Sequence, residues 1–316
     1  MSNINSVSAG RRESRLQAIR RPLTRSGPVV KGVLMIGVSD ELREEIEALR
    51  TNYLALLDKE EKEQVYQKYL EANTRLIPRE FVQNHGISCR VVLRKLSLGS
   101  DYKSDFFFLS KTSTHWNAVH IEIEKPSSKY FKGNTNEFDS GFLHALQQIN
   151  DWKAWFLRNN GEAFKNSLSA LLVPENMGKN PIRHKYVLVY GRRSEIENSD
   201  LRRSKILAQQ TDDFKIMSFD SLAEGLLGKP IMDIGIRRNE FIDLIADEVN
   251  DPAVLSFIEP TQWRINKTLH ADIESRINGK GMRIERPVGG KSVSGYKYVA
   301  DNIRTRSDTE KLEEDA

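Results

Sequence analysis

Hydrophobic positions recur at helical spacing in the first clearly patterned part of the chain. Residues 40–57 place leucine, isoleucine and tyrosine side chains on one face and charged side chains on the other, with Asp40 as the expected N-cap. A similar pattern covers residues 59–72. We therefore expect two amphipathic helices, each with one face packed against a core.

The pattern becomes strand-like after residue 88. Runs rich in β-formers at 89–93, 105–109 and 116–124 are separated by Gly, Ser, Asp and Thr, which predicts a β-meander. A long helix is expected at 140–159. Further along, strand and helix patterns alternate, with strands at 185–190 and 214–218 and helices at 200–209, 221–226 and 237–249. This order is typical of an α/β or α+β fold, in which a central mixed sheet is flanked by helices.

Charge placement divides the chain further. The first 31 residues hold seven basic residues and one acidic residue, without the apolar core of a signal peptide, and are expected to form a flexible arm that contacts phosphate or serves only as a solvated leader. Residues 32–57 form an N-terminal extension, 58–228 the candidate catalytic domain, and 229–301 a C-terminal appendage for oligomerisation or DNA contact. Residues 302–316 are expected to be a disordered acidic tail.

Composition narrows the class of protein. No run approaches the roughly 18 apolar residues of a membrane span, so no membrane partner is expected. The single Cys89 excludes an intrachain disulfide and a cysteine-cluster zinc site, which favours a reducing compartment such as the bacterial cytoplasm. The net charge of +4 is too small to indicate a nucleic-acid partner by itself.

Acidic side chains alternate with apolar ones in the third predicted strand. Because residues two apart share a strand face, His120, Glu122 and Glu124 project together while the intervening isoleucines are buried. If the preceding hairpin has its loop centred between residues 113 and 114, Asp105 lies opposite Glu122. Directly opposed Cβ atoms are about 4.5–5.5 Å apart, close enough for two carboxylates to share one Mg²⁺.

The same residues also have simpler interpretations. Acidic residues on neighbouring strands can form an exposed polar sheet face, and a lone histidine on a strand is more often a packing residue than a catalytic base. Trp152 and Trp155 could stack on bases, but their place on an amphipathic helix favours the core.

Several stretches resemble the Shedu anti-phage immune nucleases, whose shared domain has a PD-(D/E)xK core, a restriction-endonuclease-like fold. The resemblance covers roughly residues 58–228. It rests on YKSDFFFL at 102–109, IEIEKP at 121–126, HALQQINDW at 144–152, VLVYGRR at 187–193, the pair Arg202 and Arg203, and FDSL at 219–222.

The resemblance implies roles for particular residues. Asp105 and Glu122 become ligands of Mg²⁺ or Mn²⁺, and Glu124 takes the third position of the catalytic motif. Gln148 corresponds to the helix glutamine that approaches the scissile phosphate, and Glu63 to an acid on the first helix, which is a further candidate ligand together with Glu124. Glu63 can equally be read as a solvated helix residue.

One departure from the superfamily pattern concerns charge. The usual third residue is lysine, whereas Glu124 stands at this position and Lys125 follows on the opposite face. A carboxylate can position or deprotonate the attacking water, but it cannot stabilise a transition state as a cation. The residues expected to neutralise DNA phosphates without reading bases are Lys125, Lys129, Lys132, Arg192, Arg193, Arg202 and Arg203.

The resemblance implies a Mg²⁺-dependent DNA endonuclease or nickase of antiviral defence. It would act on double-stranded DNA, of phage in the first place, as a homo-oligomer, with a tetramer suggested. The alternative is a catalytically inactive DNA-binding or assembly protein that keeps the nuclease fold, as the missing motif lysine would allow. A carboxylate-based hydrolase of a small substrate is a further alternative, which would need an enclosed apolar pocket.

Overall fold

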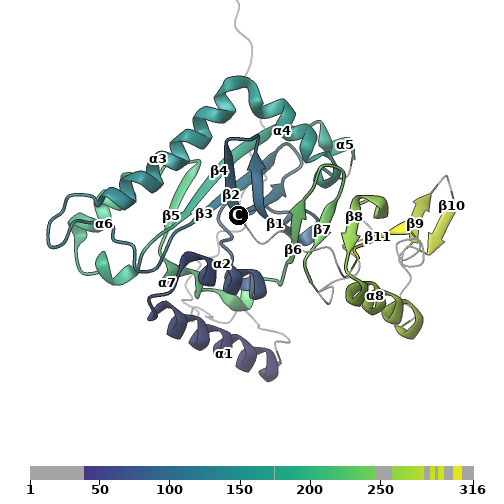
Figure 1. Cartoon of the computed structure of the whole chain (residues 1–316), viewed down its shortest axis with the longest axis horizontal. Coiled ribbons are helices and arrows are strands. Elements are labelled where there is room, and N and C mark those ends of the chain that lie inside the picture. Colours follow the sequence, from purple (N-terminus) through teal and green to yellow (C-terminus); the bar gives the residue numbers. More distant parts are fainter. Residues whose placement is uncertain are drawn as a thin grey trace, which may run out of the picture. The chain divides into compact units, whose positions relative to one another are not determined.

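A mixed β-sheet organises the chain, with helices on both of its faces (Figure 1). In the computed structural model, residues 39–173, 175–246, 258–280, 285–288, 291–294 and 302–307 are described. The chain divides into two units, residues 1–40 and 41–316, and the described structure belongs almost wholly to the second. The expected basic arm, at 1–31, and most of the expected acidic tail lie outside the described residues.

Among the described residues, nine strands form the main sheet in the order β11-β8-β7-β6-β1-β2-β3-β4-β5. The β2 strand runs antiparallel to both of its neighbours, β1 and β3, and β3, β4 and β5 are parallel. The β1 strand also pairs in parallel with β6. A separate two-stranded sheet joins β9 to β10. The bounds are β1 Val91–Leu98, β2 Tyr102–Lys111, β3 Trp116–Ile123, β4 Ile182–Val189, β5 Phe214–Met217, β6 Asp233–Arg237, β7 Ile242–Leu244, β8 Trp263–Ile265, β9 Glu285–Val288, β10 Lys291–Ser294 and β11 Arg304–Thr305.

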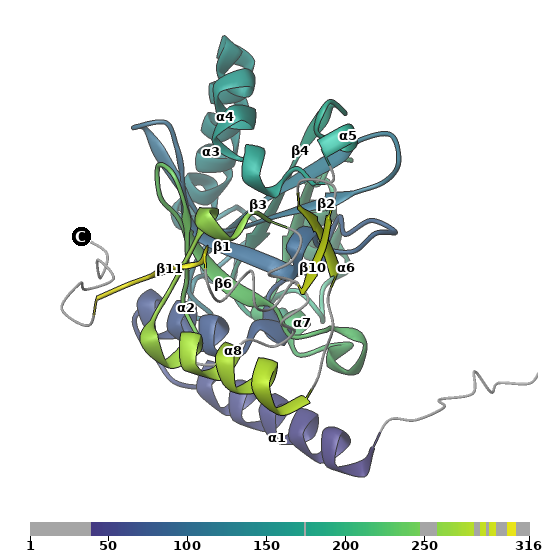
Figure 2. The ribbon, with the colours of Figure 1, turned by 90° about the vertical axis from the view of Figure 1, so that its right-hand side faces the viewer.

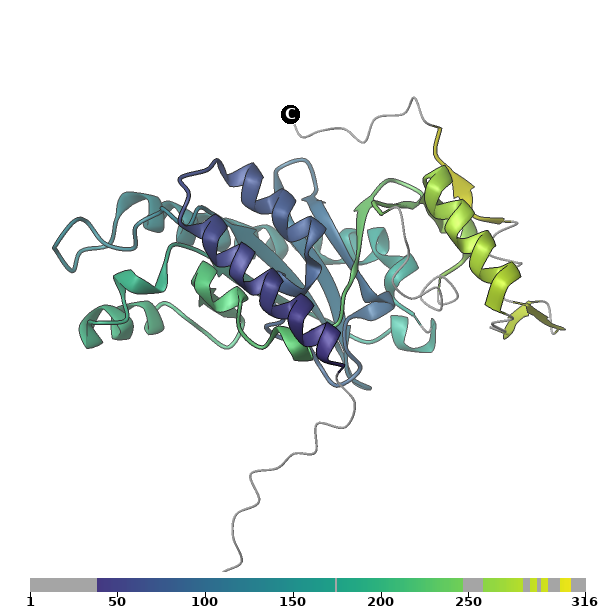
Figure 3. The same ribbon diagram turned by 90° about the horizontal axis from the view of Figure 1, so that it is seen from below.

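The helices divide between the two faces of the sheet. Figure 1 shows α3 and α4 on one side and α1, α2 and α7 on the other, and Figure 3 shows α1 and α2 lying across the sheet. The bounds are α1 Asp40–Leu57, α2 Glu63–Ala72, α3 Ser140–Trp155, α4 Gly161–Ser167, α5 Glu175–Gly178, α6 Asp200–Leu207, α7 Phe219–Leu222 and α8 Lys267–Lys280.

Each face of the sheet has its own hydrophobic core. The first core lies under α3, where Phe142 and Ile149 are buried, and it includes Leu269 of α8. Figure 2 shows the helix α8 at the front of the ribbon. The second core lies under α1 and α2, where Tyr53 and Leu70 are buried. The strands between them are covered on both sides, and every residue of β3 is buried, including the polar Asn117, His120 and Glu122.

Most of the expected elements are present. The helix at 40–57 and the β-meander are confirmed, and the β2–β3 hairpin has the expected register, because Phe106 pairs with Ile121 and Ser110 with Asn117. The long helix after the meander is α-helical only to Trp155 and continues as a π-helix over residues 156–160. The last predicted helix of the domain is shorter than expected and begins earlier, as α7.

The helix predicted at 237–249 is wrong. Residues 242–244 form β7, which pairs with β6 and β8, and β6 itself ends at Arg237. The physical reason is Asp243, a polar residue that is completely buried between two buried apolar neighbours and whose carboxylate is bound by Arg264 from β8. A partner that is distant in the sequence therefore overrides the local helical pattern.

Candidate active site

The β3 strand presents its one acidic residue, Glu122, toward α3. Ile121 and Ile123 are buried in the second core, as the alternation predicts, whereas Glu122 accepts a hydrogen bond on Oε1 from Gln148 Nε2 of α3 at 2.6 Å. The other carboxylate oxygen, Glu122 Oε2, is buried, and no hydrogen-bond donor among the described residues reaches it. The end of β3 therefore holds a buried carboxylate, and one of its oxygens has no hydrogen-bond donor among the described residues.

Asp105 of β2 is held by groups from three different elements. Its Oδ1 accepts hydrogen bonds from Gln67 Nε2 of α2 at 2.9 Å and from Lys95 Nζ of β1 at 2.6 Å. Its Oδ2 accepts from the backbone N–H of Ile123 at 2.8 Å. Sequence reasoning identified Asp105 but missed Gln67 and Lys95.

Asp105 and Glu122 accept hydrogen bonds from helices that lie on opposite faces of the sheet. The β2–β3 ladder ends at the pair Phe106 and Ile121, so Asp105 and Glu122 are the next positions in register. From there Asp105 is bound from the α2 side and Glu122 from the α3 side. The expected proximity in register is present, but the two side chains are oriented by helices of different layers.

The site holds four carboxylates, of Glu63, Asp105, Glu122 and Glu124, whose charges affect the pKa values of the three glutamates. Burial raises the pKa of Glu122 well above its ordinary value, and the charges of Asp105 and Glu124 raise it further, opposed by the Gln148 hydrogen bond and by Lys95. Burial and Asp105 also raise the pKa of Glu124. The site therefore concentrates negative charge that is costly to keep without a cation.

Glu63, whose assignment was open in the sequence, belongs to the same cluster. It begins α2, and its Oε1 accepts a hydrogen bond from Gln67 Nε2, the amide that also binds Asp105. Burial raises the pKa of Glu63, and the charges of Asp105 and Glu124 add to this shift. A solvated helix position would not produce these shifts.

The donor set suits a hard cation in part. Within the described parts of the chain, no three His, Cys, Asp or Glu side chains are arranged so that they could hold a metal ion together. Mg²⁺, however, needs only one or two protein carboxylates, because waters and substrate phosphate oxygens complete its shell. The open, buried Oε2 of Glu122 and the neighbouring Asp105 meet that smaller requirement.

A cavity of ≈ 320 Å³ opens beside Gln148, between α3 and the β1–β2 turn. The turn adopts its position because Gly99 has a left-handed φ of +63° and packs against the ring of Trp155. The cavity is also lined by Lys103 and His144, and the charge of His144 lowers the pKa of Glu124. None of the four acids lines the cavity, which reaches the site only through Gln148, the residue that binds Glu122.

The expected phosphate-binding cations are not equally available. Lys125 and Lys129 are exposed, and the charge of Lys125 lowers the pKa of Glu124. Arg192 is bound by Asp58 and Asp220, and Arg202 donates to backbone carbonyls of Gly133 and Thr135. Charge pairing continues in the remaining residues, where Lys132 pairs with Glu137, Arg193 with Glu224, and Arg203 with Asp200.

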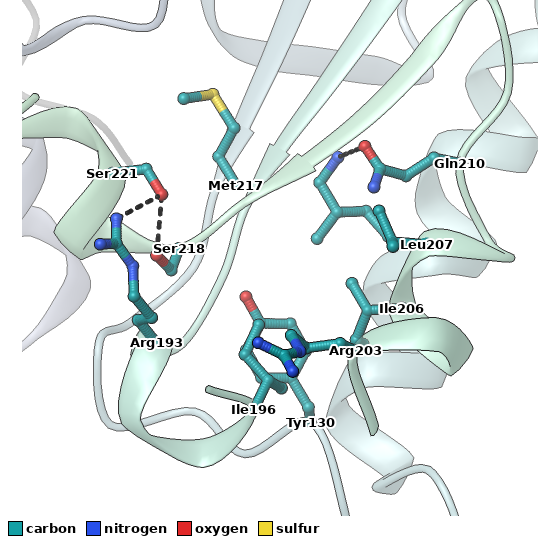
Figure 4. Close-up of a pocket in the computed structure, with 11 residues that line it drawn as sticks. Tyr130, Arg193, Ile196, Arg203, Ile206, Leu207, Gln210, Met217, Ser218 and Ser221 are labelled. Atoms are coloured by element: carbon teal, nitrogen blue, oxygen red, sulfur yellow. Dashed lines mark hydrogen bonds between the residues drawn. The ribbon is translucent and has the colours of Figure 1, made fainter. Parts of the chain in front are cut away.

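Arg193 and Arg203 also border a separate pocket of ≈ 240 Å³ near the end of β5 (Figure 4). Figure 4 shows Arg193 directed toward the hydroxyl of Ser221, while Leu207 and Met217 contribute apolar walls. These two arginines are thus partly used for local structure.

His120 and the two tryptophans are packing residues. His120 is fully buried, its Nε2 lies 3.2 Å from Nδ1 of His184, and aromatic rings surround it. Burial lowers the pKa of His120, and His184 lowers it further, so a neutral ring is favoured. Trp152 and Trp155 lie in the first core, as the amphipathic pattern favoured.

Comparison with known proteins adds one match. A family model described as Shedu protein SduA, C-terminal, matches residues 60–223, which is more than half of the chain and includes all four acids of the site. A search of curated proteins finds no match. No helix of the described residues has both the length and the apolar character needed to cross a membrane.

Proposed function

The chain belongs to the Shedu protein SduA, C-terminal, family, which indicates a role in anti-phage defence, and from this premise we propose that it is a metal-dependent DNA endonuclease or nickase. The observation that supports the proposal most strongly is the environment of the Glu122 carboxylate. This carboxylate is buried, bound on one oxygen by Gln148 and open on the other, and it lies beside Asp105 and Glu124. Such a cluster is suited to binding a cation that also binds a phosphate.

Each residue has a distinct part in the proposed reaction. Asp105 and Glu122 would hold Mg²⁺ or Mn²⁺. Glu63 or Glu124 would become a further ligand only after a side-chain rearrangement, since no three acids of the described residues are placed to hold one ion together. The metal would polarise the phosphate and lower the pKa of a bound water. Gln148 keeps Glu122 oriented by its 2.6 Å hydrogen bond.

Hydrolysis consumes one water for each bond cut. The water oxygen forms a bond to phosphorus while the bond from phosphorus to the leaving deoxyribose oxygen breaks. Glu124 accepts the proton of the attacking water, a role supported by its raised pKa, and the leaving oxygen takes a proton from solvent. The products are a phosphate monoester and a hydroxyl end.

The second candidate function is DNA binding without cleavage. It is favoured by the carboxylate of Glu124 at the position where the superfamily has lysine. Both candidate functions involve binding of double-stranded DNA, mainly that of phage, so a binding assay does not distinguish them. Metal-dependent cleavage of the DNA distinguishes them.

We would incubate the full chain with linear and with closed-circular DNA in Mg²⁺, in Mn²⁺ and in EDTA. Glu122→Gln is the test variant, because an amide retains the shape and still accepts the hydrogen bond from Gln148. Glu162→Gln is the matched control, since Glu162 is exposed on α4. We expect metal-dependent cleavage that falls at least about 100-fold in Glu122→Gln and is unchanged in the control.

Nicking of closed circles without linearisation would identify a nickase. If DNA is bound but stays intact under every metal condition, the binding-only function replaces the nuclease. If both glutamine variants cleave like the wild type, the assignment of Glu122 is wrong.

A further inference from the structure

The β1 strand changes the face to which its side chains point, midway along its length. Leu93 is buried in the first core and Val92 in the second, as regular alternation requires. Past Lys95, however, Leu96 and Leu98 are also in the first core, although alternation from Leu93 would place them in the second. The face therefore switches between Leu93 and Leu96.

Lys95 is the residue at which the switch occurs. Its φ is 46°, in the left-handed region that L-residues avoid, particularly within a strand. The β1–β2 register is the same on both sides, with Arg94 paired to Phe106 and Leu96 to Ser104, so no residue is inserted. Strained backbone of this kind persists where surrounding structure holds it, and it is concentrated at functional sites.

The neighbouring strand changes face at the matching position. Phe107 and Leu109 lie in the first core, yet Tyr102, which would fall on the other face by alternation, also packs against it. Asp105 lies between these residues, at the position opposite Lys95 in the register. The two irregularities together direct the carboxylate of Asp105 toward α2, where Gln67 binds it.

The ammonium group of Lys95 is placed among the acids. It lies 2.6 Å from Asp105 Oδ1, and its charge also lowers the pKa of Glu63 and of Glu122. The side chain of Lys95 is 27% exposed, whereas that of Asp105 is 5% exposed, so the lysine is accessible from outside the core. Lys125, the other lysine that acts on this cluster, is exposed beyond the end of β3.

We propose that Lys95 supplies, from β1, the catalytic cation that the position of Glu124 lacks. The left-handed turn of the strand at Lys95 brings its ammonium group to Asp105, where it would contact a non-bridging oxygen of the scissile phosphate. This inference rests on the proposed nuclease function and assigns a residue to it that the motif does not contain.

The role of Lys95 is electrostatic. If Asp105 is taken up by a bound cation, the ammonium group of Lys95 would exchange this carboxylate for the phosphate oxygen on which negative charge grows during attack. No proton is transferred by Lys95, since the water proton goes to Glu124 and the leaving oxygen is protonated by solvent. Removing a single such donor costs about 100- to 1,000-fold in rate.

The test compares Lys95→Gly with Lys95→Arg in single-turnover cleavage of DNA with Mg²⁺. Glycine removes the ammonium group but accepts the left-handed backbone, so the strand is retained. We expect cleavage to fall about 100- to 1,000-fold in Lys95→Gly, to recover in part with added methylammonium, and to remain higher in Lys95→Arg. Lys68→Gln, which removes an exposed charge on α2, is the control and should cleave like the wild type.

Binding of Mn²⁺ gives a readout that does not depend on cleavage. Loss of a competing cation at Asp105 should leave Mn²⁺ affinity equal or tighter in Lys95→Gly. The inference is overturned if Lys95→Gly cleaves within about threefold of the wild type, if methylammonium rescues nothing, or if Lys125→Gln alone abolishes cleavage. A wild-type chain that cleaves no DNA overturns both this inference and the proposed function, whereas a cleaving wild type with an unaffected Lys95→Gly overturns the inference alone.

Discussion

Two buried aspartates in the same sheet have opposite surroundings. Asp243 of β7 is completely buried, and three arginines surround it. Arg264 Nε lies 2.6 Å from Oδ1, Arg238 Nε lies 3.2 Å from Oδ2, and Arg306 lies at 3.7 Å. Asp105 of β2 is nearly as buried, but the charges that act on it and its neighbours are mainly carboxylates.

This contrast separates a structural acid from one that we propose to be functional. Around Asp243 the positive charges outnumber the negative ones, so binding of a further cation is electrostatically unfavourable. Around Asp105, three glutamates share the site with Lys95 and Lys125, and mutual repulsion raises the glutamate pKa values. A cluster with an excess of buried negative charge binds a cation favourably, at a cost in stability when the cation is absent.

The largest expected effect comes from neutralising each aspartate. Asp243→Asn leaves three arginines, two of them at hydrogen-bonding distance, without their acid, and we expect it to lower the free energy of unfolding by about 3–5 kcal/mol. Asp105→Asn removes one of several repelling carboxylates and keeps one acceptor oxygen for Gln67 and Lys95, but its amide nitrogen replaces Oδ2 and leaves the backbone N–H of Ile123 without its acceptor. Relief of the repulsion offsets part of that loss, so the cost should be about 1–2 kcal/mol.

Urea unfolding of the full-length chain without metal measures both aspartate variants. Equal losses would contradict the comparison, because the acid in the site would then be as structural as Asp243. A conservative control is Asp151→Asn, which changes a carboxylate on the surface of α3.

A smaller effect is expected from pH. The folded-state pKa of Glu122 is raised above the ordinary 4.5, so the folded protein holds a proton there that the unfolded chain has lost. This contribution to stability is complete below about pH 4.5 and is lost as pH rises through the raised folded value. Glu122→Gln should therefore gain stability relative to the wild type as pH rises.

Urea unfolding of the wild type and Glu122→Gln at several pH values tests this sign. If the stability of Glu122→Gln relative to the wild type falls as pH rises, Glu122 is ionised and well paired in the folded state. Adding Mn²⁺ should reduce the difference at high pH, because the cation stabilises the ionised wild-type site and has less to bind in the variant.

The sequence predicted the part of the site that depends on strand periodicity. Alternation in β3 separated Ile121 and Ile123 from Glu122, and a short hairpin fixed the register that brings Asp105 next to it. Gln148 was found only through the family resemblance, since its spacing alone does not distinguish it from a surface amide. Its hydrogen bond to Glu122 is a tertiary contact.

The features that were missed depend on conformation or on distant partners. Lys95 follows no pattern, because a left-handed residue inside a strand breaks the alternation by which strands are recognised. Gln67 is one polar residue on a mainly polar helix, and only its contact with Asp105 distinguishes it. β7 was predicted to be helical because the arginines that neutralise Asp243 come from other parts of the chain.

The smallest effect concerns backbone strain, which also differs between the two ends of the sheet. Among the described residues, the non-glycine residues with left-handed φ all lie between 81 and 95, on the side of Asp105 and remote in sequence from β7. Lys95→Ala and Lys95→Gly both remove the ammonium group, but only glycine relieves the left-handed backbone. The glycine variant should be more stable than the alanine variant by about 1 kcal/mol, measured by urea unfolding. At Arg94, where φ is not left-handed, the order should reverse, because glycine in a regular strand is costlier than alanine. If alanine is the more stable residue at both positions, the turn at Lys95 stores no strain, and the orientation of its ammonium group would have to come from the ion pair with Asp105 alone.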